Sequence, residues 1–389
     1  MGIYLDNSMA TRPSPKSISK MIPFFQEKWG HPSQPHRKGQ ELYPALNESV
    51  RNIQELLGAK PTDRFIFTSS GAEAVNHVIA SAYENITLQT GRNHYLAANT
   101  NEAPSLMAIG RLEQSQCVGK MIPVNSQGKI TEKLLGDVIT PRTALLSLDW
   151  ANGLTGVIQP IAEIASLCDE RGIALHLDAT HVLGKLYFDL EDLGASYITF
   201  NGDQLHAPKG TGGLWIKEGA AIAPWILGGI EQNGLRGGSF NVAGLVALGA
   251  AAVELIDTRD LLSIETARLR NRLEEGLLKE IPGAVIHFKE EERVPHIAAI
   301  GFPGVANEAL LFALNKQGVY ASIGGGSFQQ LGLILAASGV PEPLAHSSIS
   351  FSLSRETTDE EIEQAIPILA AAVHKLRKIS LGILPPEQK

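Results

Sequence analysis

The chain has 389 residues, of which 44% are hydrophobic and 19% charged, a composition typical of a globular protein that is long enough for two domains. Its net charge of -8 gives no reason to expect nucleic acid or an anionic membrane surface as a partner. No run of about 20 apolar residues is present. The first residues show neither the basic nor the apolar region of a signal peptide, so we expect a cytoplasmic protein.

Short apolar runs alternate with amphipathic stretches along the first two thirds of the chain. Strands are predicted at residues 64–68, 144–147, 174–178, 197–200 and 213–216. Helices are predicted at residues 72–84, 161–171, 241–258 and 263–279. This alternation is typical of a mainly parallel sheet covered by helices on both faces, so we expect a large three-layer α/β/α domain over residues 15–258.

The C-terminal third of the chain predicts a second, smaller α/β domain. The helix at 263–279 would begin the crossover into it, and strands near 284–288 and 296–301 follow. Helices at 308–316 and 359–377 complete the pattern. Together with a strand-like opening segment, we expect residues 1–14 and 259–389 to form this domain.

Residues 68–73 read Thr-Ser-Ser-Gly-Ala-Glu, between the predicted strand at 64–68 and the helix that follows. Free backbone N–H groups and the helix dipole at such a helix N-terminus attract phosphate groups. Ser70, Gly71 and Ala72 are therefore candidate phosphate-binding residues, and the alternative is a plain strand-to-helix turn. Asp178 ends another apolar strand, where an unpaired carboxylate would be costly. It is either a ligand-binding residue or a structural cap.

The two cysteines, Cys117 and Cys168, are too few for a disulfide framework and do not have the spacing of metal ligands. We predict no metal site and expect both to be incidental thiols.

Nine short motifs follow one another in a fixed order from the first residues almost to the C-terminus. They are Ile3-Tyr4-Leu5-Asp6-Asn7, Gly30-His31-Pro32-Ser33 with His36, Phe67-Thr68-Ser69 with Glu73 and Asn76, Ala151-Asn152 with Gly156, Gln159-Pro160-Ile161, His176 with Asp178-Ala179 and Gly184-Lys185, Gly228-Gly229, Leu235-Arg236-Gly237-Gly238-Ser239 with Asn241, and Phe351-Ser352-Leu353 with Arg355 and Thr357-Thr358. In this register the chain resembles the NifS/IscS-like cysteine desulfurase family of class-V aminotransferase-like, fold-type I enzymes that depend on pyridoxal phosphate (PLP). The resemblance implies that fold, that cofactor and a homodimer whose cofactor site is completed across the subunit interface.

The resemblance also implies the roles of individual residues. Asp178 would pair with the protonated pyridine nitrogen of the cofactor, which strengthens the electron sink. Asn152 would contact the ring, and His181 would replace the family's glutamine beside the ring oxygen. Asn201 begins the segment that resembles the family's cofactor-lysine segment. Ser239 matches the threonine that reaches the phosphate from the partner subunit.

Four positions that carry the family's chemistry are changed. Gln204 stands where the family has its Schiff-base lysine, and an amide cannot form an imine. Ser327 stands in place of the sulfur-accepting cysteine, and a hydroxyl cannot carry a persulfide. Ala103 replaces the histidine that stacks on the cofactor ring. Ser350 replaces the arginine that grips the substrate carboxylate.

Three functions are compatible with this pattern. The first is a family member that has lost desulfurase activity and persists as a binding or regulatory partner of a sulfur-transfer or iron-sulfur assembly protein. The second is an enzyme that holds PLP non-covalently and uses His181 or His206 as a base on an amino substrate. The third is an active cysteine desulfurase with an unrecognised arrangement. Lys209 matches a second lysine of the family's segment, so it is a poor substitute for the missing one.

Overall fold

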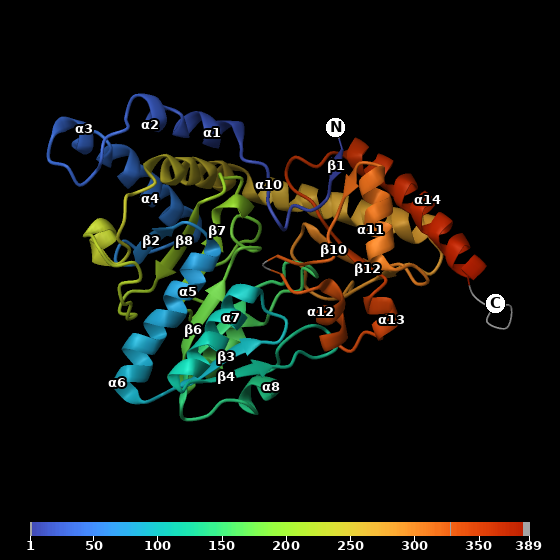
Figure 1. Ribbon diagram of the computed structural model, residues 1–389, viewed down its shortest axis with the longest axis horizontal. Helices are drawn as coiled ribbons and strands as arrows, with labels where there is room; N and C mark the ends of the chain where they lie inside the picture. Colours follow the sequence, from blue (N-terminus) through green and yellow to red (C-terminus); the bar gives the residue numbers. More distant parts are fainter. Residues whose placement is uncertain (1, 327, 384–389) are drawn as a thin grey trace.

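The larger part of the protein is built around a seven-stranded sheet (Figure 1). The computed structural model describes residues 2–326 and 328–383. The strands of this sheet are β2 (Arg64–Thr68), β3 (His94–Ala98), β4 (Val118–Ile122), β5 (Thr143–Asp149), β6 (Ala174–Asp178), β7 (Tyr197–Asn201) and β8 (Gly212–Ile216). Their order is β2-β8-β7-β6-β5-β3-β4, and only β8 runs antiparallel to its neighbours. The carboxyl ends of the other six strands therefore lie at one edge of the sheet.

Helices cover both faces of this sheet, as the alternation in the sequence predicts. The helices of the larger part include α4 (Tyr43–Leu57), α5 (Gly71–Ala82), α7 (Ala103–Leu112), α8 (Glu132–Gly136), α9 (Ile161–Glu170) and α10 (Val242–Glu280). Successive side chains of a strand point to opposite faces. In β3, Tyr95 and Ala97 accordingly join the core beneath α5 and α7, whereas Leu96 and Ala98 join the core beneath α4, α9 and α10.

The predicted pair of helices at 241–258 and 263–279 is wrong, because α10 runs unbroken for 39 residues. Residues 259–262 are Arg-Asp-Leu-Leu, with no proline or glycine to end the helix. The Asn241 side chain caps its start by accepting a hydrogen bond from the Gly244 N–H at 2.9 Å. In Figure 1 this helix extends from the larger part into the smaller one. The predicted domain boundary after residue 258 lies inside the helix and stays a prediction.

The smaller part contains two short sheets. Strands β12 (Ser348–Ser352), β10 (Ile297–Gly301) and β9 (Val285–Ile286) form an antiparallel sheet, and β1 (Ile3–Tyr4) pairs in parallel with β11 (Val319–Tyr320). Its helices are α11 (Asn307–Lys316), α12 (Leu331–Ala337), α13 (Glu342–Ala345) and α14 (Asp359–Ile383). Phe302 and Phe351 meet edge to face in its core, with ring centroids 6.4 Å apart. The strand expected at 284–288 is limited to two residues, since Phe288 adopts a positive φ of 53°.

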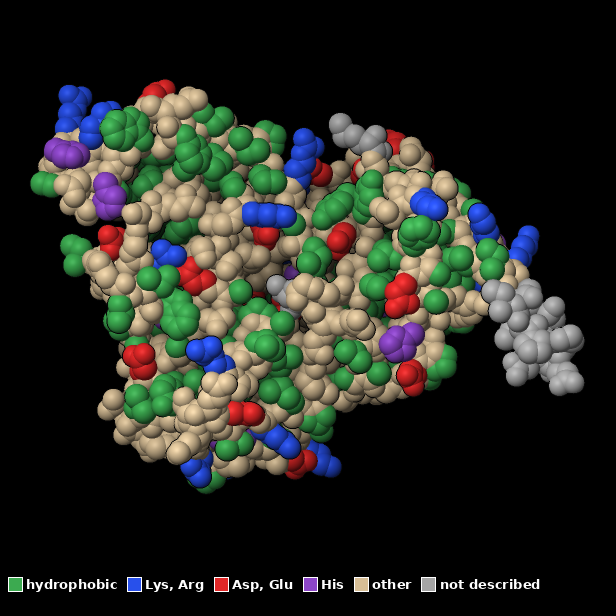
Figure 2. Space-filling model, viewed as in Figure 1, with side chains coloured by type: hydrophobic (Ala, Val, Ile, Leu, Met, Phe, Trp, Pro, Cys, Tyr) green, Lys and Arg blue, Asp and Glu red, His purple; other side chains and the backbone are tan. Residues whose placement is uncertain are grey.

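The remaining helices are short: α1 (Pro15–Met21), α2 (Pro23–Gln26), α3 (Arg37–Gln40) and α6 (Leu88–Thr90). The helix predicted at 72–84 leaves the α-helical conformation after Ala82 and continues as a π-helical turn, Tyr83–Thr87. On the face shown in Figure 2, basic and acidic side chains are interspersed over both parts of the molecule. Among the described residues, no helix is both long and apolar enough to cross a membrane.

Candidate functional site

A cavity of about 120 Å³, named the main cavity because it gathers the predicted site residues, lies at the edge of the large sheet where the parallel strands end. Its walls come from six separate segments of the chain. The residues that line it are Ser8, Met9, Ser70, Gly71, Ala72, Glu102, Pro104, Asp178, Thr180, His181, Asn201, Gln204 and Phe328. This position, beyond the carboxyl ends of β2, β6 and β7, is where ligands bind in open α/β sheets. The structure thus brings together seven of the residues predicted from the sequence: Ser70, Gly71, Ala72, Asp178, His181, Asn201 and Gln204.

The first turn of α5 forms one wall of this cavity. The Ser70 hydroxyl caps the helix by accepting a hydrogen bond from the Glu73 N–H at 3.1 Å, and the Gly71 N–H donates to Asn201 Oδ1 at 3.3 Å. Arg236 holds the Glu73 carboxylate with Nε–Oε1 at 2.8 Å. A Cβ on Gly71 would lie 3.2 Å from the Cβ of Asn201, so the close approach of helix and strand favours glycine. The wall therefore offers the N-terminus of α5 to an anion, although the N–H groups of Gly71 and Glu73 are already hydrogen-bonded.

Three carboxyl groups cluster beside this wall: Asp149 is buried, and Glu102 and Asp178 are partly buried. The Glu102 N–H donates to Asp149 Oδ2 at 2.6 Å, and the Thr180 N–H donates to Asp178 Oδ1 at 2.9 Å. Burial, followed by the neighbouring carboxylates, raises the pKa of Glu102 and of Asp149 well above the usual range. Burial also raises the pKa of Asp178, although its hydrogen bonds oppose the shift. A cationic group placed in the cavity would favour the ionised form of these acids.

His181 lies between the carboxyl cluster and the smaller part of the protein. Its Nε2 is 2.8 Å from Glu102 Oε1, and its ring packs against Phe328 with centroids 5.7 Å apart. Burial, followed by the positive charge of Lys185, lowers the pKa of His181 to about 3, so the imidazole is neutral at neutral pH. Gly153 makes this packing possible, because a Cβ there would lie 2.4 Å from atoms of both rings.

Gln204 forms the floor of the cavity at the end of a single 3₁₀ turn, Gly202–Gln204. Its Nε2 donates a hydrogen bond of 2.8 Å to the carbonyl oxygen of Ser8. Thr11 ties the N-terminal segment to the same turn, since its hydroxyl donates to the Asp203 carbonyl oxygen at 2.6 Å. Neither Gln204 Oε1 nor Ser8 Oγ has a hydrogen-bond partner among the described residues, although both atoms are buried.

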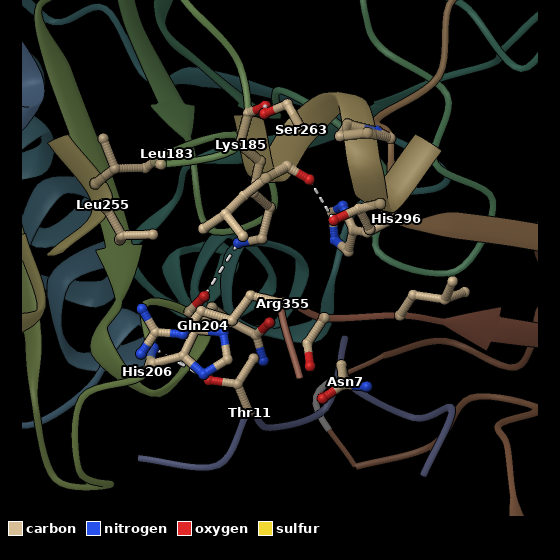
Figure 3. A pocket seen from close by; sticks show the side chains of 16 residues that line it. Asn7, Thr11, Leu183, Lys185, Gln204, His206, Leu255, Ser263, His296 and Arg355 are labelled. Atoms are coloured by element: carbon tan, nitrogen blue, oxygen red, sulfur yellow. Dashed lines mark hydrogen bonds between the residues drawn. The ribbon is translucent and has the colours of Figure 1, made fainter. Parts of the chain in front are cut away.

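A second, smaller cavity of about 50 Å³ is also lined by Gln204 (Figure 3). Lys185 enters it and donates hydrogen bonds to the carbonyl oxygens of Gln204 at 3.1 Å and of Thr180 at 3.4 Å. Burial lowers the pKa of Lys185 to about 8. His206 and Arg355 line this second cavity and not the first. Lys209, the other lysine of this segment, is exposed.

The other predicted site residues do not line the main cavity. Asn152 Oδ1 accepts hydrogen bonds from the N–H groups of Leu154 and Thr155, and its Nδ2 donates to the Thr100 carbonyl oxygen, so its amide is used in holding a turn. Ser239 is exposed on the surface of the chain. Ser327 lies outside the described residues. The cofactor contacts expected of Asn152 and Ser239 stay predictions.

The remaining polar candidates have structural surroundings. Ser350 is buried in β12 and donates a hydrogen bond to the Leu154 carbonyl oxygen at 2.7 Å. Cys117 and Cys168 are both buried, and burial raises the pKa of Cys168 to about 12. A thiol in that environment stays protonated at neutral pH and is a poor nucleophile.

Sequence reasoning missed Ser8, Met9, Asp149 and Phe328. Asp149 carries the same signal as Asp178, because it is an acidic residue that ends an apolar strand. Ser8, Met9 and Phe328 carry no local signal, since they reach the cavity only through the packing of the two ends of the chain against the larger part.

The residues present fit part of a PLP-like cofactor. The first turn of α5 suits a phosphate group, and the Asp178 carboxyl group suits a protonated ring nitrogen. Gln204 provides no amine for covalent attachment. Its buried Oε1, which lacks a donor among the described residues, marks a place where a ligand group could bind.

Comparison with known proteins gives a consistent result along nearly the whole chain. A family model described as "Aminotransferase class-V" matches residues 3–365. The chain is 35% identical over 384 residues to a cysteine desulfurase of Gluconacetobacter diazotrophicus, covering 97% of this chain and 95% of that protein. It is 34% identical over 382 residues to the cysteine desulfurase NifS of Azotobacter vinelandii, covering 97% and 94%.

Solved structures agree with these matches. A structure described as a NifS-like protein superposes with a TM-score of 0.88 at 28% identity, covering 99% of this chain and all of that chain. A NifS-like protein from Rickettsia africae gives a TM-score of 0.85 at 25% identity, covering 96% and 100%. Together with the mainly parallel sheet, they confirm the predicted fold-type I α/β architecture.

Proposed function

Because this chain belongs to the class-V aminotransferase family and is a homologue of NifS-like cysteine desulfurases, we propose that it is a catalytically degenerate member of that group. In this proposal it holds a vitamin B6 phosphate without a covalent bond, forms a homodimer in the cytoplasm and acts as a binding partner in sulfur or iron-sulfur metabolism. Both the cysteine desulfurases and the class-V aminotransferases depend on PLP.

The single observation that carries the proposal is that a buried, hydrogen-bonded glutamine, Gln204, lines the main cavity at the position of the family's lysine. The Gln204 side chain occupies the floor of the main cavity, is buried and is held by a hydrogen bond to the Ser8 carbonyl oxygen. An amide nitrogen is not nucleophilic, so it cannot replace the amine that anchors PLP in the family. Lys185 is a half-buried amine that contacts this turn from another segment. It donates hydrogen bonds to the carbonyl oxygens of Thr180 and Gln204 and lines the second cavity.

Other changes at the site support the same conclusion. Ala103, at the start of α7, presents no aromatic or acid-base group. Ser350 is engaged with a backbone carbonyl, and its short hydroxyl side chain lacks the fork of donors that binds a carboxylate. Ser327 stands at the aligned position of the sulfur-accepting cysteine. Because residues at several separate catalytic positions are replaced, loss of the desulfurase reaction explains the pattern better than one substitution that leaves the reaction intact.

The residues that remain would hold the cofactor by its two polar ends. The first turn of α5 would bind the phosphate, with Ser70, Gly71 and Ala72 next to it. Asp178 would pair with the ring nitrogen. When bound, PLP supplies an electron sink for chemistry on amines. In this site, binding and orientation are the functions that the retained residues support.

The histidine-base alternative has weaker support. His181 lines the cavity, but a pKa of about 3 makes its imidazole a weak base near neutral pH. His206 lies outside the main cavity, and its Nδ1 is 2.8 Å from the Arg12 carbonyl oxygen. The third alternative, an active cysteine desulfurase, matches the names of the relatives. An assay of desulfurase activity distinguishes it from our proposal.

That assay supplies L-cysteine and PLP to the purified protein and measures sulfide, alanine and protein-bound persulfide. We expect no sulfide above a blank that contains free PLP, because the anchoring lysine and the sulfur-accepting cysteine are both replaced. An active cysteine desulfurase assayed in parallel serves as the positive control. Sulfide release with an equal amount of alanine would contradict the proposal and favour the third alternative.

A further inference from the structure

Gln204 and Ser8 line the main cavity, and neither Gln204 Oε1 nor Ser8 Oγ has a hydrogen-bond partner among the described residues. Gln204 is 2% exposed and Ser8 is 4% exposed, so their side chains are shielded from bulk water. A buried acceptor that lacks a partner is costly, and the cost falls when a ligand supplies a donor. These two atoms therefore favour ligands that can donate hydrogen bonds to them.

The orientation of the Gln204 amide is fixed by its surroundings. Its nitrogen lies 2.8 Å from the Ser8 carbonyl oxygen, which can only accept a hydrogen bond. The amide oxygen is consequently the free end of the side chain. The Ser8 backbone is itself held, because its N–H donates to Ser352 Oγ at 2.8 Å. The floor of the cavity thus presents an acceptor where the family's lysine would present an amine.

The charged groups around the cavity also favour a ligand that carries a hydrogen-bond donor. Glu102 and Asp178 line it, and no lysine or arginine does so among the described residues. His181 is neutral, because burial lowers its pKa. The Gln204 amide oxygen can only accept a hydrogen bond, so it favours a protonated amine and disfavours an aldehyde oxygen, which is itself an acceptor. A protonated amine would also favour the ionised forms of Glu102 and Asp178.

We infer that this site selects the amine form of the cofactor, pyridoxamine phosphate, over the aldehyde form, PLP. The inference rests on the proposed cofactor site, in which Gln204 occupies the place of the residue that bonds the aldehyde carbon. An aminomethyl group at that carbon donates to Gln204 Oε1, with Ser8 Oγ as a second acceptor. A hydrogen bond to a charged donor makes binding about ten-fold tighter or more.

The test compares three ligands by isothermal titration calorimetry: pyridoxamine phosphate, PLP and 4-deoxypyridoxine phosphate. The last ligand carries a methyl group in place of the aminomethyl group, so it keeps the ring and the phosphate and lacks only the donor. Comparing it with pyridoxamine phosphate isolates the contribution of the amine in the unaltered protein. It also avoids reaction of the PLP aldehyde with surface lysines.

We expect the wild-type protein to bind pyridoxamine phosphate about ten-fold more tightly than either other ligand. Gln204→Leu should remove this preference while retaining binding through the phosphate and the ring. Gln204→Glu, which keeps an acceptor oxygen, should retain the preference. Gln329→Leu is the matched control, because Gln329 also donates to backbone carbonyls but does not line the cavity. Thermal unfolding verifies that each variant is folded.

The outcomes separate the inference from the function on which it rests. Equal or tighter binding of 4-deoxypyridoxine phosphate or PLP to the wild-type protein would overturn the amine preference and leave the cofactor site intact. A failure of all three phosphates to bind at millimolar concentration would overturn both. If Gln204→Leu does not fold, the comparison of the three ligands in the wild-type protein still decides the question.

Discussion

In the proposed cofactor site, Gln204 stands where the family's lysine would bond the cofactor. After incubation with PLP and reduction with borohydride, we expect mass spectrometry to find no phosphopyridoxyl adduct on residues 200–210. In Gln204→Lys, an amine returns to the floor of the cavity, so an adduct and a visible absorbance band should appear there. Sulfide release should remain absent, because Ala103 and Ser327 are unchanged. An adduct on Lys209 of the wild-type protein that clearly exceeds those on other exposed lysines would contradict the alignment, and Lys209→Met tests that origin directly.

Asp178 and Asp149 end neighbouring strands, yet only Asp178 lines the cavity. If Asp178 pairs with the ring nitrogen as proposed, replacing it with asparagine should weaken binding of pyridoxamine phosphate about ten-fold or more, because the charged partner is lost. The same change at Asp149 should affect binding less, since that side chain holds the Glu102 N–H. Calorimetric titration of both variants provides the comparison, and equal losses would argue against a ring contact by Asp178.

The buried carboxyl cluster should also influence how stability depends on pH. The pKa of Asp149 is raised on folding, so the folded protein retains a proton that the unfolded chain releases. Its contribution to stability is therefore greatest below the ordinary carboxyl range and is lost as pH rises through the folded pKa. The substitution Asp149→Asn should remove this loss, because an asparagine side chain is neutral at every pH. Melting temperatures of the wild type and this variant should diverge in favour of the variant as pH rises above the ordinary carboxyl pKa of about 4. Parallel melting curves above that pH would contradict a raised pKa.

At the scale of elements, the packing of α10 against α4 requires a close approach that only glycine allows. A Cβ on Gly249 would lie 2.6 Å from the Cα of Ser49, a backbone atom that cannot move alone. Gly249→Ala should therefore destabilise the protein by about 1–3 kcal/mol, as overpacked cores do. Gly110, in α7, has open space around its Cβ position. Gly110→Ala should be neutral or should stabilise by about 0.5–1 kcal/mol. Denaturant unfolding of the two variants measures the difference, and equal effects would exclude steric contact as the cause.

For the whole molecule, the loop that carries Ser239 bears on assembly. Leu227 and Ile230 in the same region are 80% and 84% exposed in the single chain, although both are large and apolar. A homodimer that covers this loop would bury them and bring Ser239 toward the partner's site. We expect sedimentation velocity to show a dimer that Leu227→Asp weakens or dissociates. Leu261→Asp is the control, because Leu261 is also 71% exposed but lies on α10. A monomeric wild-type protein would contradict this expectation.

Much of the large sheet could be predicted because its strands carry their own signal. The bounds of β2 and β6 agree with the prediction at both ends, since each is a short run of mostly apolar residues that ends at a polar one. The unbroken course of α10 could not be predicted in the same way. A run of polar residues, Asp-Thr-Arg-Asp at 257–260, interrupts its apolar pattern, and its two halves pack into two different cores.

The sequence by itself determined the family, the fold class and the absence of an amine at position 204. Those properties follow from the order of the residues, which can be read without knowing which segments contact one another. Only the tertiary structure decided that Ser8 and Phe328, far apart in the chain, share a cavity with Gln204, and that the Asn152 amide is used by its own turn. Hydrogen-bond partners and burial arise from segments that meet only on folding. The Gln204 side-chain oxygen is buried and lacks a donor among the described residues, and neither property could be predicted from the residue alone.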